Sequence, residues 1–286
     1  MVATMRSAGI GLRLPHLAEV VATTPQVGWL EIHPENFLAN PHAAQLLDEI
    51  ARGYSVSVHT VGVSVGSATG LDRAHLARVR ALVDRIRPAY VSGHLAWSSL
   101  GSTYLNDLLP LPYDAESLAV VAAHVAEVQD ALGRQYLIEN PSSYVGFRGS
   151  AMTEPEFLSA LVDRTGCGVL CDVSNVYLSA HNMRFDAKRY IDELPAAAVQ
   201  ELHLGGFSVE DDGANPGRLL LVDTHDTAID PGTWALYEHA CERFSHAATL
   251  IEWDADVPSL ETLVAEAMHA DEIAAVAREG ARRGAR

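Results

Sequence analysis

The sequence predicts an α/β fold, a single (β/α)8 TIM barrel. Eight short runs rich in Val, Ile, Leu and Tyr recur along the chain, and the stretches between them carry helical periodicity. The length of 286 residues suits one such barrel. Because the apolar runs are nearly continuous, we expect parallel strands covered by helices. A doubly wound open sheet is the alternative fold, but no Gly-x-Gly-x-x-Gly motif follows the first run.

The expected strands are short and regularly spaced. In chain order they cover residues 9–14, 29–33, 55–61, 89–96, 135–140, 168–173, 199–204 and 249–253. Apolar residues three and four apart mark one face of a covering helix at Leu118, Val121, Val125, Val128 and Leu132. Asp72 and Asp114 are the expected N-caps of two helices, and Thr153 with Glu156 predicts a capping box.

Composition limits the cellular setting and the partners. No linker or low-complexity tract divides the chain, so we expect one domain over residues 1–286, with flexible tails at 1–7 and about 276–286. The formal net charge of −17 disfavours nucleic acid as a partner. The sequence shows neither a secretory segment nor a membrane span, which predicts a cytoplasmic protein without membrane contact. Its three cysteines are too few for a disulfide framework.

Six successive expected strands carry a histidine, an aspartate or a glutamate at or just before their carboxyl end. In barrels of this kind the carboxyl ends of the strands carry the active site. Three histidines and three carboxylates that converge in a buried mouth would be unfavourable without a compensating cation. The candidate metal ligands at these strand ends are His59, His94, Glu139, Asp172, His203 and Glu252.

Three further residues enlarge the candidate site. Asn175 follows Asp172 by three positions, and Asp223 and His225 lie two apart in the loop after the seventh strand. Nine candidate donors exceed what one open catalytic ion uses, so the sequence predicts two or three metal ions. The donors are nitrogen and oxygen without a thiolate, which suits iron, manganese or zinc and does not choose among them.

These strand ends resemble the xylose-isomerase-like barrels, and their spacing is similar to the trinuclear pattern of endonuclease IV. Asn175 departs from that pattern, which has a histidine there. With Asn175, several short motifs resemble the multinuclear non-heme iron-dependent oxidative enzymes (MNIO), the family that includes the methanobactin biosynthesis oxidase. The motifs lie at residues 9–13, 31–37, 92–97, 138–140 and 202–206, and the resemblance runs from about residue 8 to 274.

The resemblance implies an oxidoreductase that uses O2 to modify a peptide, usually at a cysteine, during maturation of a ribosomally made natural product. It implies two or three iron ions in mixed Fe(II)/Fe(III) states. By analogy, His59, His94 and Glu139 would hold one iron, and Glu139 would bridge to a second. The second iron would also use Asp172, His203 and Glu252, and the third would use Asn175, Asp223 and His225.

The same resemblance suggests what surrounds the metals. It implies a precursor peptide as substrate and a separate protein that recognises the leader of that peptide. The loop from Gly62 to Gly70 is rich in small residues and could let a peptide backbone approach closely, although a plain flexible loop explains it equally well. Substrate-binding or supporting roles are expected at the open face, and no catalytic residue is assigned beyond the metal ligands. The residues expected there are His33, Glu35, Asn36, Asn140 and His181.

Three other functions stay open from sequence alone. A metal-dependent phosphodiesterase of the endonuclease IV type would use the metals to activate water, although the net charge of −17 and Asn175 disfavour it. A sugar isomerase or epimerase on the same barrel would need one or two ions and a catalytic base. A scaffold without catalytic activity would leave the convergent ligands without a purpose.

Overall fold

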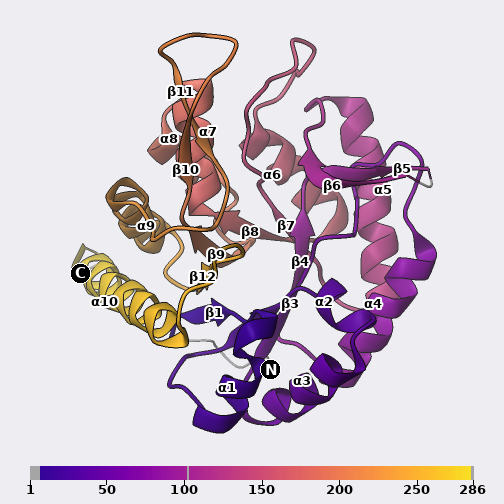
Figure 1. Cartoon of the computed structure of the whole chain (residues 1–286). Helices are drawn as coiled ribbons and strands as arrows, with labels where there is room; N and C mark the ends of the chain where they lie inside the picture. Colours follow the sequence, from indigo (N-terminus) through magenta and orange to yellow (C-terminus); the bar gives the residue numbers. More distant parts are fainter. Residues whose placement is uncertain (1–6, 102, 285–286) are drawn as a thin grey trace.

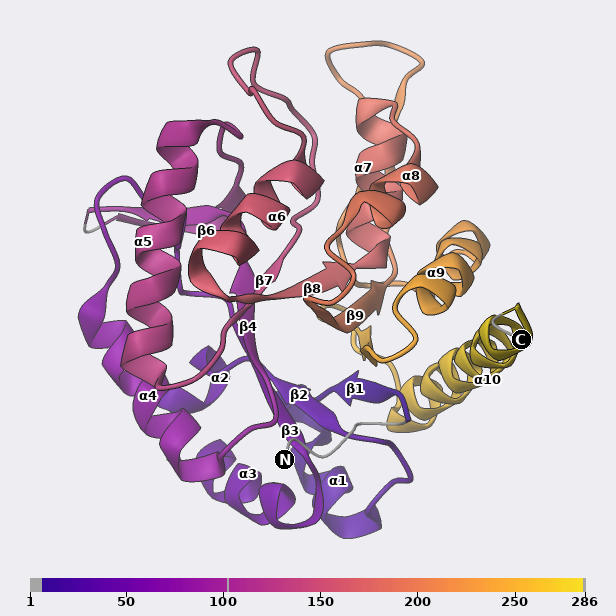
Figure 2. The ribbon, with the colours of Figure 1, turned by 180° about the vertical axis from the view of Figure 1, so that it is seen from behind.

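A computed structural model describes residues 7–101 and 103–284. Within these ranges, eight parallel strands close into a barrel in the order β1-β12-β9-β8-β7-β4-β3-β2. The single (β/α)8 barrel predicted from the sequence is therefore confirmed, and Figures 1 and 2 show the helices arranged around it. The strands are β1 (Gly9–Gly11), β2 (Leu30–Ile32), β3 (Val56–Thr60), β4 (Val91–His94), β7 (Leu137–Glu139), β8 (Gly168–Asp172), β9 (Val199–Gly205) and β12 (Ala248–Glu252).

The covering helices follow the predicted periodicity. Leu118, Val121 and Val125 are buried on the inner face of α5, as their spacing predicts. The helices are α1 (Leu17–Thr23), α2 (Glu35–Leu38), α3 (Pro41–Gly53), α4 (Arg73–Ile86), α5 (Ala115–Leu132), α6 (Glu154–Thr165), α7 (Val173–Met183), α8 (Ala187–Glu193), α9 (Pro231–Arg243) and α10 (Leu260–Gly284), with a short 3-10 turn at Leu14–His16.

The predicted helix starts are present. The Asp72 carboxylate accepts hydrogen bonds from the backbone N–H groups of Ala74 and His75, and Asp114 accepts one from Ser117. Thr153 and Glu156 form the predicted capping box of α6. These side chains satisfy backbone donors that the first helical turn leaves open, which fixes where each helix begins.

Two antiparallel hairpins were not predicted. One pairs β5 (Trp97–Leu100) with β6 (Thr103–Leu109) after β4, and the other pairs β10 (Ser208–Asp211) with β11 (Leu219–Val222) after β9. Both rise on the side of the barrel where the loop between β7 and α6 also lies (Figure 1). They therefore build walls around the carboxyl ends of the barrel strands.

Of the two expected tails, the structure describes mainly the C-terminal one. Residues 1–6 and 285–286 lie outside the described part of the chain. From about residue 276, where the sequence analysis expects a tail, α10 continues to Gly284, and Ala277 is buried in the core. None of the helices among the described residues combines the length and apolar content that a membrane span needs.

A buried carboxyl group at the start of α6 makes stability depend on pH. Burial raises the pKa of Glu154 to about 7, although the nearby hydroxyl groups of Tyr113 and Tyr190 act to lower it. Because this folded-state pKa lies above the unfolded value, its contribution to stability is present at low pH and is lost as pH rises through about 7. The full effect is on the order of 3 kcal/mol.

Glu154→Gln should therefore remove part of this pH dependence. The amide keeps the shape of the side chain and cannot ionise. In urea denaturation between pH 5 and 8, we expect the stability of the variant relative to the natural protein to increase with pH. Parallel stability curves over this range would contradict the assigned pKa.

Candidate metal centre

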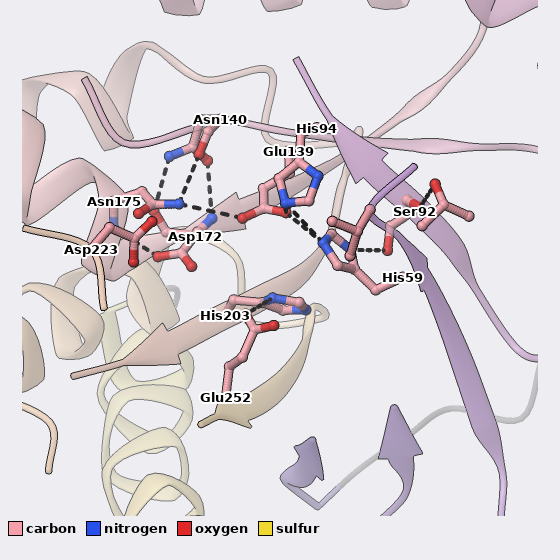
Figure 3. A network of polar contacts seen from close by, with 12 residues as sticks. His59, Ser92, His94, Glu139, Asn140, Asp172, Asn175, His203, Asp223 and Glu252 are labelled. Atoms are coloured by element: carbon pink, nitrogen blue, oxygen red, sulfur yellow. Dashed lines mark hydrogen bonds and ion pairs between the residues drawn. The ribbon is translucent and has the colours of Figure 1, made fainter. Parts of the chain in front are cut away.

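The six residues predicted from strand ends lie together at the carboxyl end of the barrel strands (Figure 3). All face the barrel interior, and all but the partly exposed His94 are buried. A cavity of about 390 Å³ opens above them. Its lining includes His59, His94, Glu139, Asn175, Asp223, His225 and Glu252. The structure thus brings all nine candidate ligands to one mouth, with Asp172 and His203 beneath the lining residues.

His59, His94 and Glu139 form the first group of converging donors. Their ligand atoms lie within 4.8 Å of one another. The Nε2 atoms of His59 and His94 are 3.1 Å apart, and Glu139 Oε2 lies 3.2 Å and 3.4 Å from them. Ser92 Oγ contacts Nδ1 of His59 at 2.8 Å, which turns Nε2 toward the centre of the group. Three donor atoms therefore point at one position.

Burial keeps both imidazoles of this group neutral. It lowers the pKa of His59 well below its usual value, with a further lowering from His94. Burial also lowers the pKa of His94 to about 4. A neutral imidazole offers a nitrogen lone pair, which is the form that binds a metal ion.

Two further groups are linked to the first through carboxylates that neighbouring groups share. Glu139, Asp172 and His203 form one, and Asp172, His225 and Glu252 form the other, each with ligand atoms within 4.8 Å. Glu139 thus belongs to two groups, and so does Asp172. This overlap gives both carboxylates positions from which they could bridge adjacent ions. Asp223 lies beside the last group, with Oδ1 at 2.9 Å from Nε2 of His225.

Two asparagines fix the carboxylates. The Asn140 side chain donates to the carbonyl of Asp172 at 3.0 Å and accepts from its N–H at 2.9 Å, so it positions the end of β8. Asn175 Nδ2 donates to the Asn140 carbonyl at 3.2 Å and to Glu139 Oε1 at 3.4 Å. Asn175 Oδ1 is left buried and without a hydrogen-bond partner beside the cavity, where it is available as an oxygen ligand.

The polar atoms of this site fit a cluster of cations. Buried atoms without a hydrogen-bond partner include Glu139 Oε2 and Asp172 Oδ2. Burial, together with neighbouring carboxylates, raises the pKa of Glu139 well above its usual value and that of Asp172 to about 7. Since unpaired buried carboxylates are costly, divalent cations would stabilise the arrangement.

A buried arginine on the wall of the site was not predicted from the sequence. Arg13 donates from Nη2 to Glu252 Oε1 at 3.1 Å and from Nε to Asp254 Oδ1 at 2.6 Å. Burial acts to lower the pKa of Arg13, but Asp254 and Glu252 outweigh it, so the guanidinium stays charged. A Cβ at Gly11 would lie 2.9 Å from this guanidinium, which explains the glycine two residues earlier.

A second glycine makes room for a candidate ligand. A Cβ at Gly205 would lie 2.3 Å from the ring of His225. His225 itself has a φ of 45°, an uncommon backbone conformation that its hydrogen bond to the Gly206 carbonyl at 3.1 Å helps to hold. The Gly205-Gly206 pair after β9 therefore seats the His225 imidazole over the site.

The five residues expected around the metals have different positions. His33 contacts Glu252 Oε1 at 3.3 Å, and Asn36 lines the cavity. Glu35 lies in an adjoining groove, where it accepts from the Gly62 N–H and contacts His75. Asn140 supports Asp172, as described above. His181 is not brought to the site, because it lies exposed on α7 with Nε2 3.3 Å from the Leu219 carbonyl.

Comparison with known proteins assigns the family. Residues 7–275 match the family model described as RiPP precursor modification enzyme MbnB/TglH/ChrH, where RiPP denotes a ribosomally synthesised and post-translationally modified peptide. The chain belongs to this family. A UPF0276 protein of Vibrio parahaemolyticus is 45% identical over 91% of this chain and 89% of its own length. A UPF0276 protein of Chromobacterium violaceum is 46% identical over 93% and 94%.

Solved structures agree with the fold. A D-tagatose 3-epimerase-like protein superposes with a TM-score of 0.59 at 15% identity, covering 98% of this chain and 100% of its own. An L-ribulose 3-epimerase gives a TM-score of 0.58 at 16% identity, with coverage of 98% and 96%. These likenesses confirm the barrel fold. The membership in the MbnB/TglH/ChrH family identifies the chain as a RiPP-modifying enzyme.

Glu139→Gln should lose more than one equivalent of bound metal. Glu139 takes part in two donor groups, and a neutral amide is a poor bridge between two cations. Elemental analysis of the purified variant would measure the loss, with Glu154→Gln as a control at a carboxyl group outside the site. Loss of one equivalent or none in a folded Glu139→Gln variant would indicate a ligand of a single ion.

Proposed function

We propose that this enzyme is an iron-dependent oxidase that uses O2 to modify a precursor peptide, with a cysteine of the peptide as the reacting residue. The observation that carries the proposal is the set of overlapping donor groups linked by Glu139 and Asp172. Nitrogen and oxygen donors of this kind suit iron. Iron bound there would supply the redox chemistry that activates O2.

The chain supplies no thiol to the site. Cys167, Cys171 and Cys241 are free and buried, and none of them lines the cavity. Burial raises the pKa of Cys171 well above its usual value, and the neighbouring Asp172 raises it further, which keeps this thiol protonated. A thiolate at the metals would therefore come from the substrate.

The shape of the mouth suits one side chain of an extended peptide. The cavity of about 390 Å³ above the metal ligands adjoins a groove of about 710 Å³, and both are lined by His33, Asn36 and Val61. Gly62, Thr69 and Gly70 line the groove, so small residues of the 62–70 loop lie where a peptide backbone would pass. The reacting side chain would enter the cavity while its neighbours occupy the groove.

Protein groups at the mouth would orient the reaction. Arg13 fixes the Glu252 carboxylate, and Ser92 and Asn140 fix His59 and Asp172. Such supporting hydrogen bonds hold ligands in place and tune the metals they bind. The buried surroundings restrict water, which strengthens the electrostatic interactions inside the site.

Iron and O2 should both be required for peptide modification. We expect mass spectrometry after co-expression with a precursor peptide encoded near the enzyme to show a mass change with the natural protein. His59→Ala should abolish the change, because it removes one ligand of the first group. His181→Ala is the matched control and should retain it, because His181 lies outside the cavity. Full activity with stoichiometric zinc and no iron would contradict the proposal.

A separate partner protein would present the leader of the peptide. Exposed apolar side chains lie on segments that surround the mouth, and a partner could cover them. A long disordered leader also loses entropy on binding, which a second interface would offset. These side chains are Leu100 and Tyr104 on the first hairpin, Tyr144, Val145 and Phe147 after β7, and Val209 and Leu219 on the second hairpin.

Phe147→Asp should weaken the stimulation by the partner. In a reconstituted reaction with iron, reductant and O2, we expect full-length precursor to be modified faster when the leader-binding protein is present. Met268→Asp is the control, since Met268 is also exposed but lies on α10 away from the mouth. If the purified chain modifies the precursor equally fast alone, the partner proposal is wrong.

A further inference from the structure

A pair of glutamates lies one layer below the metal ligands. Glu31 on β2 and Glu201 on β9 are fully buried inside the barrel. Glu201 precedes His203 by two residues, so both point inward from the same strand. Oε1 of Glu31 is 3.5 Å from Nε2 of His203, and Oε1 of Glu201 is 3.7 Å from the same atom.

This pair has few other partners. Ser57 Oγ donates to Glu31 Oε2 at 2.9 Å. Oε1 of Glu31 and both carboxylate oxygens of Glu201 are buried without a hydrogen-bond partner. Among the described residues, neither glutamate forms an ion pair with an arginine or a lysine. Both carboxylates face Nε2 of His203. A proton on this nitrogen would give them a donor.

The opposite ring nitrogen of His203 faces the metal ligands. Its Nδ1 lies 3.0 Å from Glu252 Oε2, and Glu252 also contacts His225 Nδ1 at 3.6 Å. A neutral imidazole carries one proton, so a proton on Nε2 leaves the lone pair on Nδ1. The arrangement parallels His59, whose Nδ1 contacts Ser92 while Nε2 faces the first group of donors.

We propose that Glu31 and Glu201 are positioning residues that hold the Nε2 proton of His203, so that Nδ1 presents its lone pair to the metal centre. This inference rests on the proposed metal site. Metal-binding histidines commonly donate their second N–H to a carboxylate, which fixes the tautomer and increases the basicity of the ligand. The two glutamates would also place negative charge beneath the cations, which favours their binding.

The role predicts opposite effects on metal affinity and on the stability of the metal-free protein. Removing a carboxylate that supports a metal ligand commonly costs on the order of 10- to 100-fold in metal affinity. Without metal, the two buried carboxylates lie close enough to repel each other and have only Ser57 and His203 as partners, so replacing one of them by a neutral amide should leave stability unchanged or raise it. A purely structural role would lower the stability of the metal-free protein instead.

The test compares Glu31→Gln, Glu201→Gln and the double variant with the natural protein. Anaerobic titration with Fe(II) measures affinity, and thermal denaturation of the metal-free proteins measures stability. We expect the double variant to bind its weakest iron on the order of 100-fold less tightly and each single variant to lose less, because one carboxylate remains. Glu154→Gln, which changes a buried carboxyl group outside the site, should keep the natural affinity.

Three results would overturn this assignment while the proposed metal site stands. They are equal Fe(II) affinity in the natural protein and the double variant, an equal loss in Glu154→Gln, and a loss of affinity that merely follows lower stability of the metal-free double variant. A natural protein that binds no iron would overturn the proposed function, and this assignment with it. The two failures are therefore distinguishable.

Discussion

Repulsion among buried carboxylates is the constraint on which the structure of the barrel mouth depends. Glu139, Asp172 and Glu252 converge there, and Arg13 offsets part of the charge through Glu252. Burial keeps His59 and His94 neutral, so these imidazoles add lone pairs rather than positive charge. Divalent cations at the overlapping donor groups would balance the remaining charge and connect them.

The barrel fold places the charged and polar side chains of the mouth at defined positions. Alternation along each strand directs every second residue inward, and the parallel register places Asp172 beside His203 and His94 beside Glu139. Contacts between strands then fix individual side chains, as Asn140 does for Asp172. The two hairpins and the loop after β7 rise on the side of the barrel where the mouth lies (Figure 1), and most of the candidate ligands drawn in Figure 3 come from the barrel strands. The strands thus position six of the nine candidate ligands, and the segments around them would contact the proposed peptide substrate.

The strands and the polar residues at their carboxyl ends could be predicted from the sequence because both follow a simple period. Glu139 and Asp172 each end an apolar run, which makes them visible without a structure. The hairpins were missed because Trp97–Leu100 and Thr103–Leu109 have mostly polar or exposed residues and bury little apolar surface.

Glu31, Glu201 and Arg13 were missed for a different reason. The candidate ligands were sought at strand ends, whereas Glu31 lies in the middle of β2 and Glu201 lies within β9. The spacing of two between Glu201 and His203 is a signal that could have placed both on one face. Arg13 follows β1, and its contact with Asp254 joins residues 241 positions apart. Only the closed barrel brings these two ends of the chain together.

Anomalous X-ray diffraction at the iron absorption edge, from crystals grown anaerobically, tests the central claim most directly. We expect at least two anomalous peaks, one between His59, His94 and Glu139 and another between Glu139, Asp172 and His203, with Glu139 contacting both. A map without iron peaks at these positions, in crystals of protein purified with iron present, would contradict a multinuclear iron centre at the mouth of this barrel.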